Sequence, residues 1–240
     1  YYFNMANQKL LLLSHTHFPA EHPSYFKWIK KIKSLTKWNQ VIHLGDLADM
    51  GSLSFYDSSA EMDSPVIEIN KAKQSIRKLE KLFPKMDILY GNHDIRVTRK
   101  AEKYGIPREY IKDLNHILDI KGDWNWHDKL IVKLDNGNRV FFTHHFKSSV
   151  LQSSKELGCS LICSHQHTKS DLSYWSSPTS LNFAMLIGSS INPKHENFRY
   201  SKHFIRRPII SVASIGYSGY CQPCIHTMPL DNNGRWTGQI

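Results

Sequence analysis

The chain has 240 residues, of which 40% are hydrophobic and 22% are charged. These proportions exclude a disordered or fibrous protein and predict one globular domain over residues 1–240. No apolar run reaches the roughly 20 residues that span a bilayer, and residues 1–9 lack the pattern of a signal peptide. We therefore expect a cytoplasmic protein with no membrane partner. Met5 is a natural initiator, so residues 1–4 are interpreted as a possible vector-derived remnant.

The formal net charge of the chain is +10. A positive surface raises the local concentration of anions and favours phosphate-rich polymers as partners. Much of the charge lies in two clusters, Lys27–Lys33 and Arg96–Lys103. We interpret the first cluster as the solvated face of a helix. The second directly follows a polar motif, so its position favours contact with phosphate.

Hydrophobic periodicity predicts alternating strands and helices in the first half of the chain. The predicted elements are strands at 9–13, 41–44 and 86–90, helices at 23–35 and 65–83, an irregular loop at 50–63, and a charged helical region at 95–118. The second helix begins at Pro65, behind Ser64 as its N-cap.

The second half of the chain is rich in predicted strands and turns. Residues 135–138, Asp-Asn-Gly-Asn, are a strong hairpin signal between strands at 129–134 and 139–142. Further strands are predicted at 181–187, 208–215, 224–230 and 236–240. Strand–helix alternation followed by hairpins predicts an α/β fold with two packed sheets and helices outside them.

Five short segments place potential metal ligands directly after an apolar run. They are Ser14–His17, Gly45–Asp49, Gly91–Asp94, Thr143–His145 and Ser164–His167. Loops at the ends of several strands can converge on one point at a sheet edge. Imidazole, carboxylate and amide groups suit zinc, manganese and iron. A single histidine after a strand is usually structural, but five such segments together predict a metal site.

The order and spacing of these segments resemble the calcineurin-like metallophosphoesterase superfamily. Its usual pattern is D-x-H, G-D-x-x-D, G-N-H-D/E, a strand ending in His, and G-H-x-H, and the resemblance covers residues 10–167. It implies a four-layer αββα sandwich of two mixed β-sheets flanked by helices. It also implies a hydrolase with two divalent metal ions as cofactors, of which Mn, Zn, Fe and Ni are candidates.

The resemblance implies a role for each motif residue. Asp46 would bridge the two ions, and a bridging hydroxide would attack phosphorus. The implied ligands are His15, His17 and His167 for the first ion, and Asn92, His144 and His165 for the second. His93 would act as the general acid and Asp94 would orient it. Arg96 and Arg99 would contact the phosphate.

Several nearby residues have competing interpretations. His144 and His145 compete for one ligand position, and alternation along a strand end lets only one of them face the metals. The family pattern, usually His-Gly here, favours His144. Asp49 is interpreted as a residue that caps a turn or braces Asp46, and His43 as structural.

Two positions depart from the family pattern. Ser164 replaces a glycine, which is a mild change. His15 replaces the first aspartate, either by natural variation or by an introduced substitution. Imidazole carries no negative charge and competes with a proton near pH 6.5, so the first ion should bind more weakly.

We predict a metal-dependent phosphoesterase that hydrolyses phosphodiester or phosphomonoester bonds, with nucleic acid or nucleotides as the favoured substrates. One alternative is a small-molecule or cyclic-nucleotide phosphatase or phosphodiesterase. Another is a catalytically weakened protein that still binds nucleic acid, because His15 has impaired the first metal position. The sequence predicts no particular oligomeric state.

Overall fold

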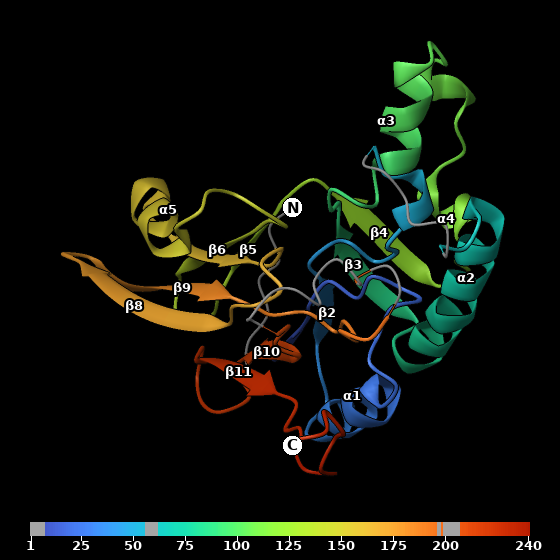
Figure 1. Cartoon of the computed structure of the whole chain (residues 1–240). Helices are drawn as coiled ribbons and strands as arrows, with labels where there is room; N and C mark the ends of the chain where they lie inside the picture. Colours follow the sequence, from blue (N-terminus) through green and yellow to red (C-terminus); the bar gives the residue numbers. More distant parts are fainter. Residues whose placement is uncertain (1–7, 56–61, 196–197, 199–206) are drawn as a thin grey trace.

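The computed structural model describes residues 8–55, 62–195, 198 and 207–240. Two β-sheets pack face to face, and helices cover their outer faces (Figure 1). Residues 1–4 and part of the predicted loop at 50–63 lie outside the described residues. Among the described residues, no helix is long and apolar enough to cross a membrane.

The first sheet has six strands, in the order β11-β10-β1-β2-β3-β4. Their bounds are β1 Leu10–Leu13, β2 Gln40–His43, β3 Lys85–Leu89, β4 Asp123–His127, β10 Ser211–Ile215 and β11 Pro223–Thr227. Strands β1 to β4 run parallel. Strand β10 pairs antiparallel with β1, and β11 pairs antiparallel with β10. The carboxyl ends of β1, β2 and β3 therefore share one edge of the sheet.

The second sheet has five strands, in the order β5-β6-β7-β9-β8. Their bounds are β5 Leu130–Lys133, β6 Arg139–Phe142, β7 Ser160–Cys163, β8 Asp171–Ser177 and β9 Ser180–Leu186. The three central strands are parallel and the two outer strands are antiparallel to them. Both sheets are thus mixed, as the sequence predicts.

Helices α1 (Tyr25–Ser34) and α2 (Pro65–Leu82) pack on the first sheet, and α5 (Val150–Leu157) packs on the second (Figure 1). The short elements η1 (Gly51–Leu53), η2 (Arg108–Tyr110) and α4 (Leu114–Ile117) lie in connections. Helix α3 (Arg96–Lys103) has no buried residue and projects from the body of the protein (Figure 1). The α/β sandwich predicted from the sequence is confirmed.

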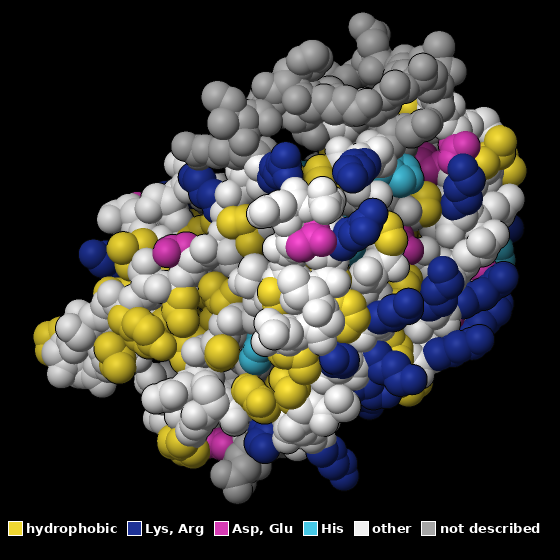
Figure 2. All heavy atoms as spheres, turned by 60° about the horizontal axis from the view of Figure 1, so that its bottom comes forward, with side chains coloured by type: hydrophobic (Ala, Val, Ile, Leu, Met, Phe, Trp, Pro, Cys, Tyr) yellow, Lys and Arg dark blue, Asp and Glu magenta, His cyan; other side chains and the backbone are white. Residues whose placement is uncertain are grey.

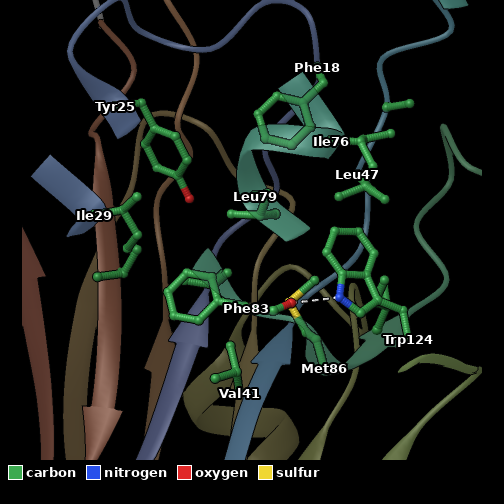
Figure 3. Close-up of a cluster of buried hydrophobic side chains, with 14 of the residues drawn as sticks. Phe18, Tyr25, Ile29, Val41, Leu47, Ile76, Leu79, Phe83, Met86 and Trp124 are labelled. Atoms are coloured by element: carbon green, nitrogen blue, oxygen red, sulfur yellow. Dashed lines mark hydrogen bonds between the residues drawn. The ribbon is translucent and has the colours of Figure 1, made fainter. Parts of the chain in front are cut away.

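Strand β1 is buried on both faces, which explains its uninterrupted run of leucine. Leu11 and Leu13 face α1 and α2, whereas Leu10 and Leu12 face the second sheet. The helix-side core includes Phe83 and Trp124 (Figure 3), and Trp124 Nε1 donates a 2.8 Å hydrogen bond to the Phe83 carbonyl. The strand that leads into the first motif is therefore fixed by packing on both sides.

Most predicted strands lie within a few residues of their predicted positions, but two predicted regions differ and three elements were not predicted. The predicted helical region at 95–118 is broken into α3, η2 and α4, because Gly105 has a positive φ and Pro107 cannot continue the helix. Residues 236–240 form no strand, and Trp236 makes an isolated bridge with Leu230. Strands β4 and β8 and helix α5 were not predicted.

Candidate metal centre

All five polar segments lie directly after strands. Three follow β1, β2 and β3 of the first sheet, and two follow β6 and β7 of the second sheet. Both sheets therefore contribute side chains to one region, at the carboxyl ends of parallel strands.

The backbone of this region has an unusual conformation. His17, Asp46 and His165 have positive φ angles of 49°, 50° and 79°. Such angles are uncommon for residues other than glycine and are found most often at functional sites. The amides of Thr16 and His17 both donate to the Asp46 carbonyl, at 3.1 and 2.9 Å. This pairing holds the first two motifs against each other.

One group of potential ligands surrounds His144 Nε2. Asn92 Oδ1, His165 Nδ1 and Asp46 Oδ2 each lie 3.1 Å from this nitrogen. One imidazole N–H can donate to only one of them, so hydrogen bonding does not account for the arrangement. Ligands around a tetrahedral zinc ion lie about 3.3 Å apart, given bonds of about 2.0–2.1 Å. The spacing of this group therefore suits a shared divalent ion.

A second group consists of His15, His17 and His167. Their ligand atoms lie within 4.8 Å of one another. His15 Nε2 and His17 Nε2 are buried and have no hydrogen-bond partner among the described residues. Buried polar atoms normally have a partner, so two unpaired nitrogens beside a third histidine indicate room for a ligand such as a metal ion.

Asp46 lies between the two groups. Its Oδ1 accepts a 2.7 Å hydrogen bond from the His93 amide. Its Oδ2 accepts no hydrogen bond from the described residues and lies 3.6 Å from His17 Nε2 and 3.1 Å from His144 Nε2. One carboxylate oxygen is thus positioned for a role between two ions. The residues present fit a site for two divalent metals.

Two of the histidines are oriented through their second ring nitrogen. His17 Nδ1 lies 2.9 Å from Asp49 Oδ1, and His144 Nδ1 donates to the Leu44 carbonyl at 2.7 Å. Metal-binding histidines usually have such a partner, which fixes the tautomer and leaves the other nitrogen free. A further group of His17, Asp49 and His93 also has ligand-bearing atoms within 4.8 Å. Its short contacts are hydrogen bonds that orient the two histidines.

The predicted contact between Asp94 and His93 is not the one that the structure shows. Asp49 takes that place: His93 Nδ1 lies 3.1 Å from Asp49 Oδ1 and 2.7 Å from the Asp49 carbonyl. Asp94 instead accepts backbone hydrogen bonds from Asp46, Leu47 and Gly91, at 2.7 to 3.0 Å. Asp94 therefore fixes the loop that carries Asp46, where the backbone is left-handed and the amides of Asp46 and Leu47 both point to the Asp94 carboxylate.

Burial and neighbouring charges set the protonation of these groups. Burial lowers the pKa of His93, but the charges of Asp46 and Asp49 outweigh it, so the pKa lies above its ordinary value. Burial alone would raise the pKa of Asp49, but its hydrogen bonds to His17 and His93 hold it well below the ordinary value. Asp49 is therefore an ionised carboxylate, and His93 is the imidazole that most readily carries a proton beside it.

His15 differs electrostatically from a free imidazole. Burial, together with the charges of His167, His17 and His144, holds its pKa well below the ordinary value. A proton therefore competes for this nitrogen at a lower pH than the value near 6.5 expected from the sequence. His15 is available as a neutral ligand at physiological pH.

Arg96 and Arg99 begin the exposed helix α3. Arg96 donates to the carbonyls of Asp49 and Met50, and its Nη2 lies 3.1 Å from His93 Nε2. Arg99 lies over the Phe55 ring, with 5.6 Å between the guanidinium carbon and the ring centroid. Arg96 therefore reaches the edge of the metal centre, whereas Arg99 lies farther along helix α3.

His145 and His43 occupy different surroundings from the ligand groups. His145 is exposed and its ring lies tilted against that of His165, with ring centroids 4.6 Å apart. His43 is buried within β2, where its Nε2 lies 3.1 Å from Thr16 Oγ1 and burial lowers its pKa to about 3. The described contacts place His144 next to Asp46.

The sequence of the chain matches the description of one protein family, calcineurin-like phosphoesterase, over residues 9–198. The chain belongs to the calcineurin-like phosphoesterase family. A comparison with curated protein sequences found no match. The two mixed sheets of this calcineurin-like phosphoesterase agree with the architecture that the sequence motifs imply.

Three solved structures illustrate its similarity to known proteins. Vps29 from Chaetomium thermophilum is 13% identical, with 96% of this chain and 92% of that chain covered and a TM-score of 0.49. YfcE, a phosphoesterase from E. coli, is 14% identical, with 87% and 88% covered and a TM-score of 0.46. The nuclease MPE from Pseudomonas putida is 11% identical, with 90% and 86% covered and a TM-score of 0.33.

Asp49 is the residue whose part in the site the sequence interpretation missed. The sequence suggested that Asp49 caps a turn or braces Asp46, whereas the structure places Asp49 against His17 and His93. Its position three residues after Asp46, in the second motif, was the available signal. Spacing alone did not reveal which neighbour the carboxylate would face.

Gly91 allows the second and third motifs to pack together, and its replacement should disrupt the centre. A Cβ atom at Gly91 would lie 2.0 Å from Asp46 Oδ1 and 2.2 Å from the Asp46 amide. We expect Gly91→Ala to displace Asp46 and to weaken metal binding at least tenfold, because carboxylate ligands need close positioning. Metal content after dialysis against graded chelator measures this effect.

Gly219→Ala is the matched control. Its Cβ would meet only the end of the flexible Gln222 side chain, at 3.1 Å. Metal retention equal to that of the unaltered protein is expected for this variant. Equal retention by Gly91→Ala would show that the approach of Gly91 to Asp46 does not matter for binding.

Proposed function

We propose that this calcineurin-like phosphoesterase hydrolyses phosphate esters with two divalent metal ions, and that its substrate is nucleic acid or a nucleotide. The position of Asp46 Oδ2 carries the proposal. It is a buried carboxylate oxygen that accepts no hydrogen bond from the described part of the chain, placed between two groups of histidines. A bridging ligand of this kind is what a two-metal hydrolytic site requires.

The proposed ligand sets follow the two groups. His15, His17 and His167 would hold the first ion, Asn92, His144 and His165 the second, and Asp46 both. When bound, such ions acidify a water molecule and offset the negative charge of a phosphoryl group. Mn, Zn, Fe and Ni suit a set of imidazole, amide and carboxylate ligands.

His93 is the proposed proton donor to the departing oxygen. Its pKa is raised, so a proton is available near neutral pH. Asp49 holds one side of the ring, and Arg96 lies 3.1 Å from Nε2 on the other. A phosphate oxygen placed between His93 and Arg96 would accept hydrogen bonds from both. Asp94 would act indirectly, by fixing the backbone of Asp46.

Helix α3 supports a polyanionic substrate. It begins two residues after the third motif and carries four cations, Arg96, Arg99, Lys100 and Lys103, with no buried residue. Lys103 Nζ lies 5.0 Å from the centroid of the Phe55 ring, and Tyr104 and Tyr110 are exposed beyond the helix. Cations interspersed with exposed rings are typical of surfaces that bind single-stranded nucleic acid.

The other basic surface lies on the outer helices. Lys and Arg side chains gather on the side of the molecule where α1 and α2 lie (Figure 2). On α1, Lys27 and Lys30 are exposed. Their helix buries its opposite face, with Trp28 and Ile29, against the first sheet. This cluster is therefore the better candidate for a solvated face, and α3 for substrate contact.

A screen of metals against substrates tests the proposed function. The chain, stripped of metal and reloaded with one metal at a time, is assayed on single-stranded DNA, RNA, cyclic nucleotides and a generic phosphodiester. Turnover of polynucleotide, lost on metal removal, is expected. Preference for cyclic nucleotides would favour the small-molecule alternative. A single bound ion with nucleic-acid binding and no turnover would favour the weakened alternative.

His93→Ala should lower turnover about a hundredfold or more, because general acid catalysis is typically worth 10²–10⁴. Metal content should not change, since His93 belongs to neither proposed ligand set. Steady-state rates at matched metal loading measure the effect. His145→Ala, which removes a nearby exposed histidine, is the control and should retain its rate. Unchanged turnover in His93→Ala would remove His93 from the reaction.

Removing charge from α3 should weaken polynucleotide binding selectively. We expect the double variant Arg99→Ser, Lys103→Ser to raise KM for single-stranded DNA about tenfold and to reduce its salt dependence, because about two phosphate contacts are lost. KM for a small diester should stay constant. The double variant Lys27→Ser, Lys30→Ser on α1 loses the same charge and is the control. Equal effects of the two double variants would show that binding depends on the net charge of the protein and not on α3.

His15→Asp should raise the affinity for manganese and increase phosphodiesterase activity. A carboxylate places a negative charge beside a dication in a buried site, where charges interact strongly. His15 itself is fully buried, so water screens this interaction weakly. Manganese titration of both forms, followed by diester assays, tests the idea. Equal affinity and equal turnover would show that His15 is a fully competent ligand.

A further inference from the structure

The two residues that depart from the family pattern touch each other. His15 follows β1 of the first sheet and Ser164 follows β7 of the second. The Nδ1 atom of His15 contacts the Oγ atom of Ser164, although 149 positions separate the residues in the sequence. Both side chains are buried. The imidazole of His15 and the hydroxyl of Ser164 are therefore in direct contact in the protein interior.

The His15 ring needs a hydrogen-bond acceptor at Nδ1 if Nε2 is to bind a ligand. A neutral imidazole carries one proton, so a free electron pair on Nε2 requires the proton to be on Nδ1. The other neighbour of Nδ1 is the His165 amide, at 3.2 Å, which can donate to this nitrogen only while the ring proton is on Nε2. A metal on Nε2 requires the proton to be on Nδ1, where this amide cannot serve as its partner. Among the described contacts of Nδ1, the Ser164 hydroxyl is the acceptor. A glycine at position 164 would leave the buried N–H unsatisfied, which is costly.

The same device recurs in the neighbouring histidines. Asp49 holds Nδ1 of His17, and the Leu44 carbonyl holds Nδ1 of His144. In both residues Nε2 faces the centre, and Nε2 of His15 is likewise buried without a hydrogen bond. A carboxylate or a carbonyl is the usual partner of such a histidine. At His15 the Ser164 hydroxyl takes this place.

We propose that Ser164 is a positioning residue for His15, and that the two form a functional unit. The hydroxyl accepts a hydrogen bond from the Nδ1–H of His15, which leaves the electron pair of Nε2 directed to the first metal position. The proposal rests on the proposed metal centre but not on its substrate. An aspartate at position 15 would have no ring proton to place, so the hydroxyl would then be dispensable.

A double-mutant cycle on metal affinity tests the pair. Ser164→Ala and Ser164→Thr are made in the unaltered chain and together with His15→Asp. Zinc and cobalt(II) are titrated into each metal-free protein in competition with a chromophoric chelator. The cobalt(II) absorption spectrum and X-ray absorption report the ligands, independently of activity. Ser14→Ala is the matched control, because Ser14 is buried next to His15 and its Oγ has no hydrogen-bond partner among the described residues.

With His15 present, Ser164→Ala should lower the affinity for one of the two ions about 10–100-fold, and the spectra should show one imidazole ligand fewer at that ion. Ser164→Thr, which keeps the hydroxyl, should restore affinity, and Ser14→Ala should change it less than about threefold. Combined with His15→Asp, Ser164→Ala should have little effect.

Equal losses from Ser164→Ala in both backgrounds would overturn the proposal, since Ser164 would then be merely structural. Affinity unaltered by Ser164→Ala would also overturn it. Two ions bound without turnover on any ester would contradict the proposed function while leaving this pair intact. Failure of the unaltered chain to bind any ion would overturn both.

Discussion

The centre depends on one buried carboxylate, Asp46, that has a single hydrogen-bonded oxygen. Burial disfavours its charge, yet the charges of His144, His93 and His17 outweigh burial and hold its pKa well below the ordinary value. The His93 amide occupies Oδ1, and the backbone amide of Asp46 is held by Asp94. Oδ2 is consequently fixed in place, beside His144 Nε2 and without a hydrogen bond from the described residues. A buried carboxylate oxygen of this kind is costly unless a cation lies beside it.

The two sheets make this arrangement rigid. Strand β1 is packed by leucine on both faces, and its partners β2 and β10 are hydrogen-bonded to it on either side. The strained turns at His17 and Asp46 follow such strands directly. Strain of this kind persists only where surrounding structure over-determines the backbone. The apolar core therefore supports the polar site, and the loops have little freedom to relax.

The sequence predicted which residues converge, but not all of the contacts among them. An apolar run before each motif was enough to place His17, Asp46 and His144 at strand ends. The predicted contact between Asp94 and His93 was wrong. Asp94 accepts a hydrogen bond from the amide of Asp46, whose backbone is left-handed, and Asp49 contacts His93 instead. The edge strands β4 and β8 were not predicted because their half-exposed residues include many polar side chains, which weakens the hydrophobic pattern. The contact between positions 15 and 164 depends on two sheets meeting, which no local pattern encodes.

The charge of the centre follows from these contacts. With imidazole at position 15, Asp46 is the carboxylate shared by both proposed ligand sets. Asp49 is a second ionised carboxylate, separated from the first position by the ring of His17. Its hydrogen bond to Nδ1 increases the electron density that Nε2 offers, so part of its charge reaches the metal position through the imidazole. The same carboxylate favours the proton on His93. Asp49 thus partly replaces the negative charge absent at His15 and supports the proposed acid, and loss of its charge would affect both roles together.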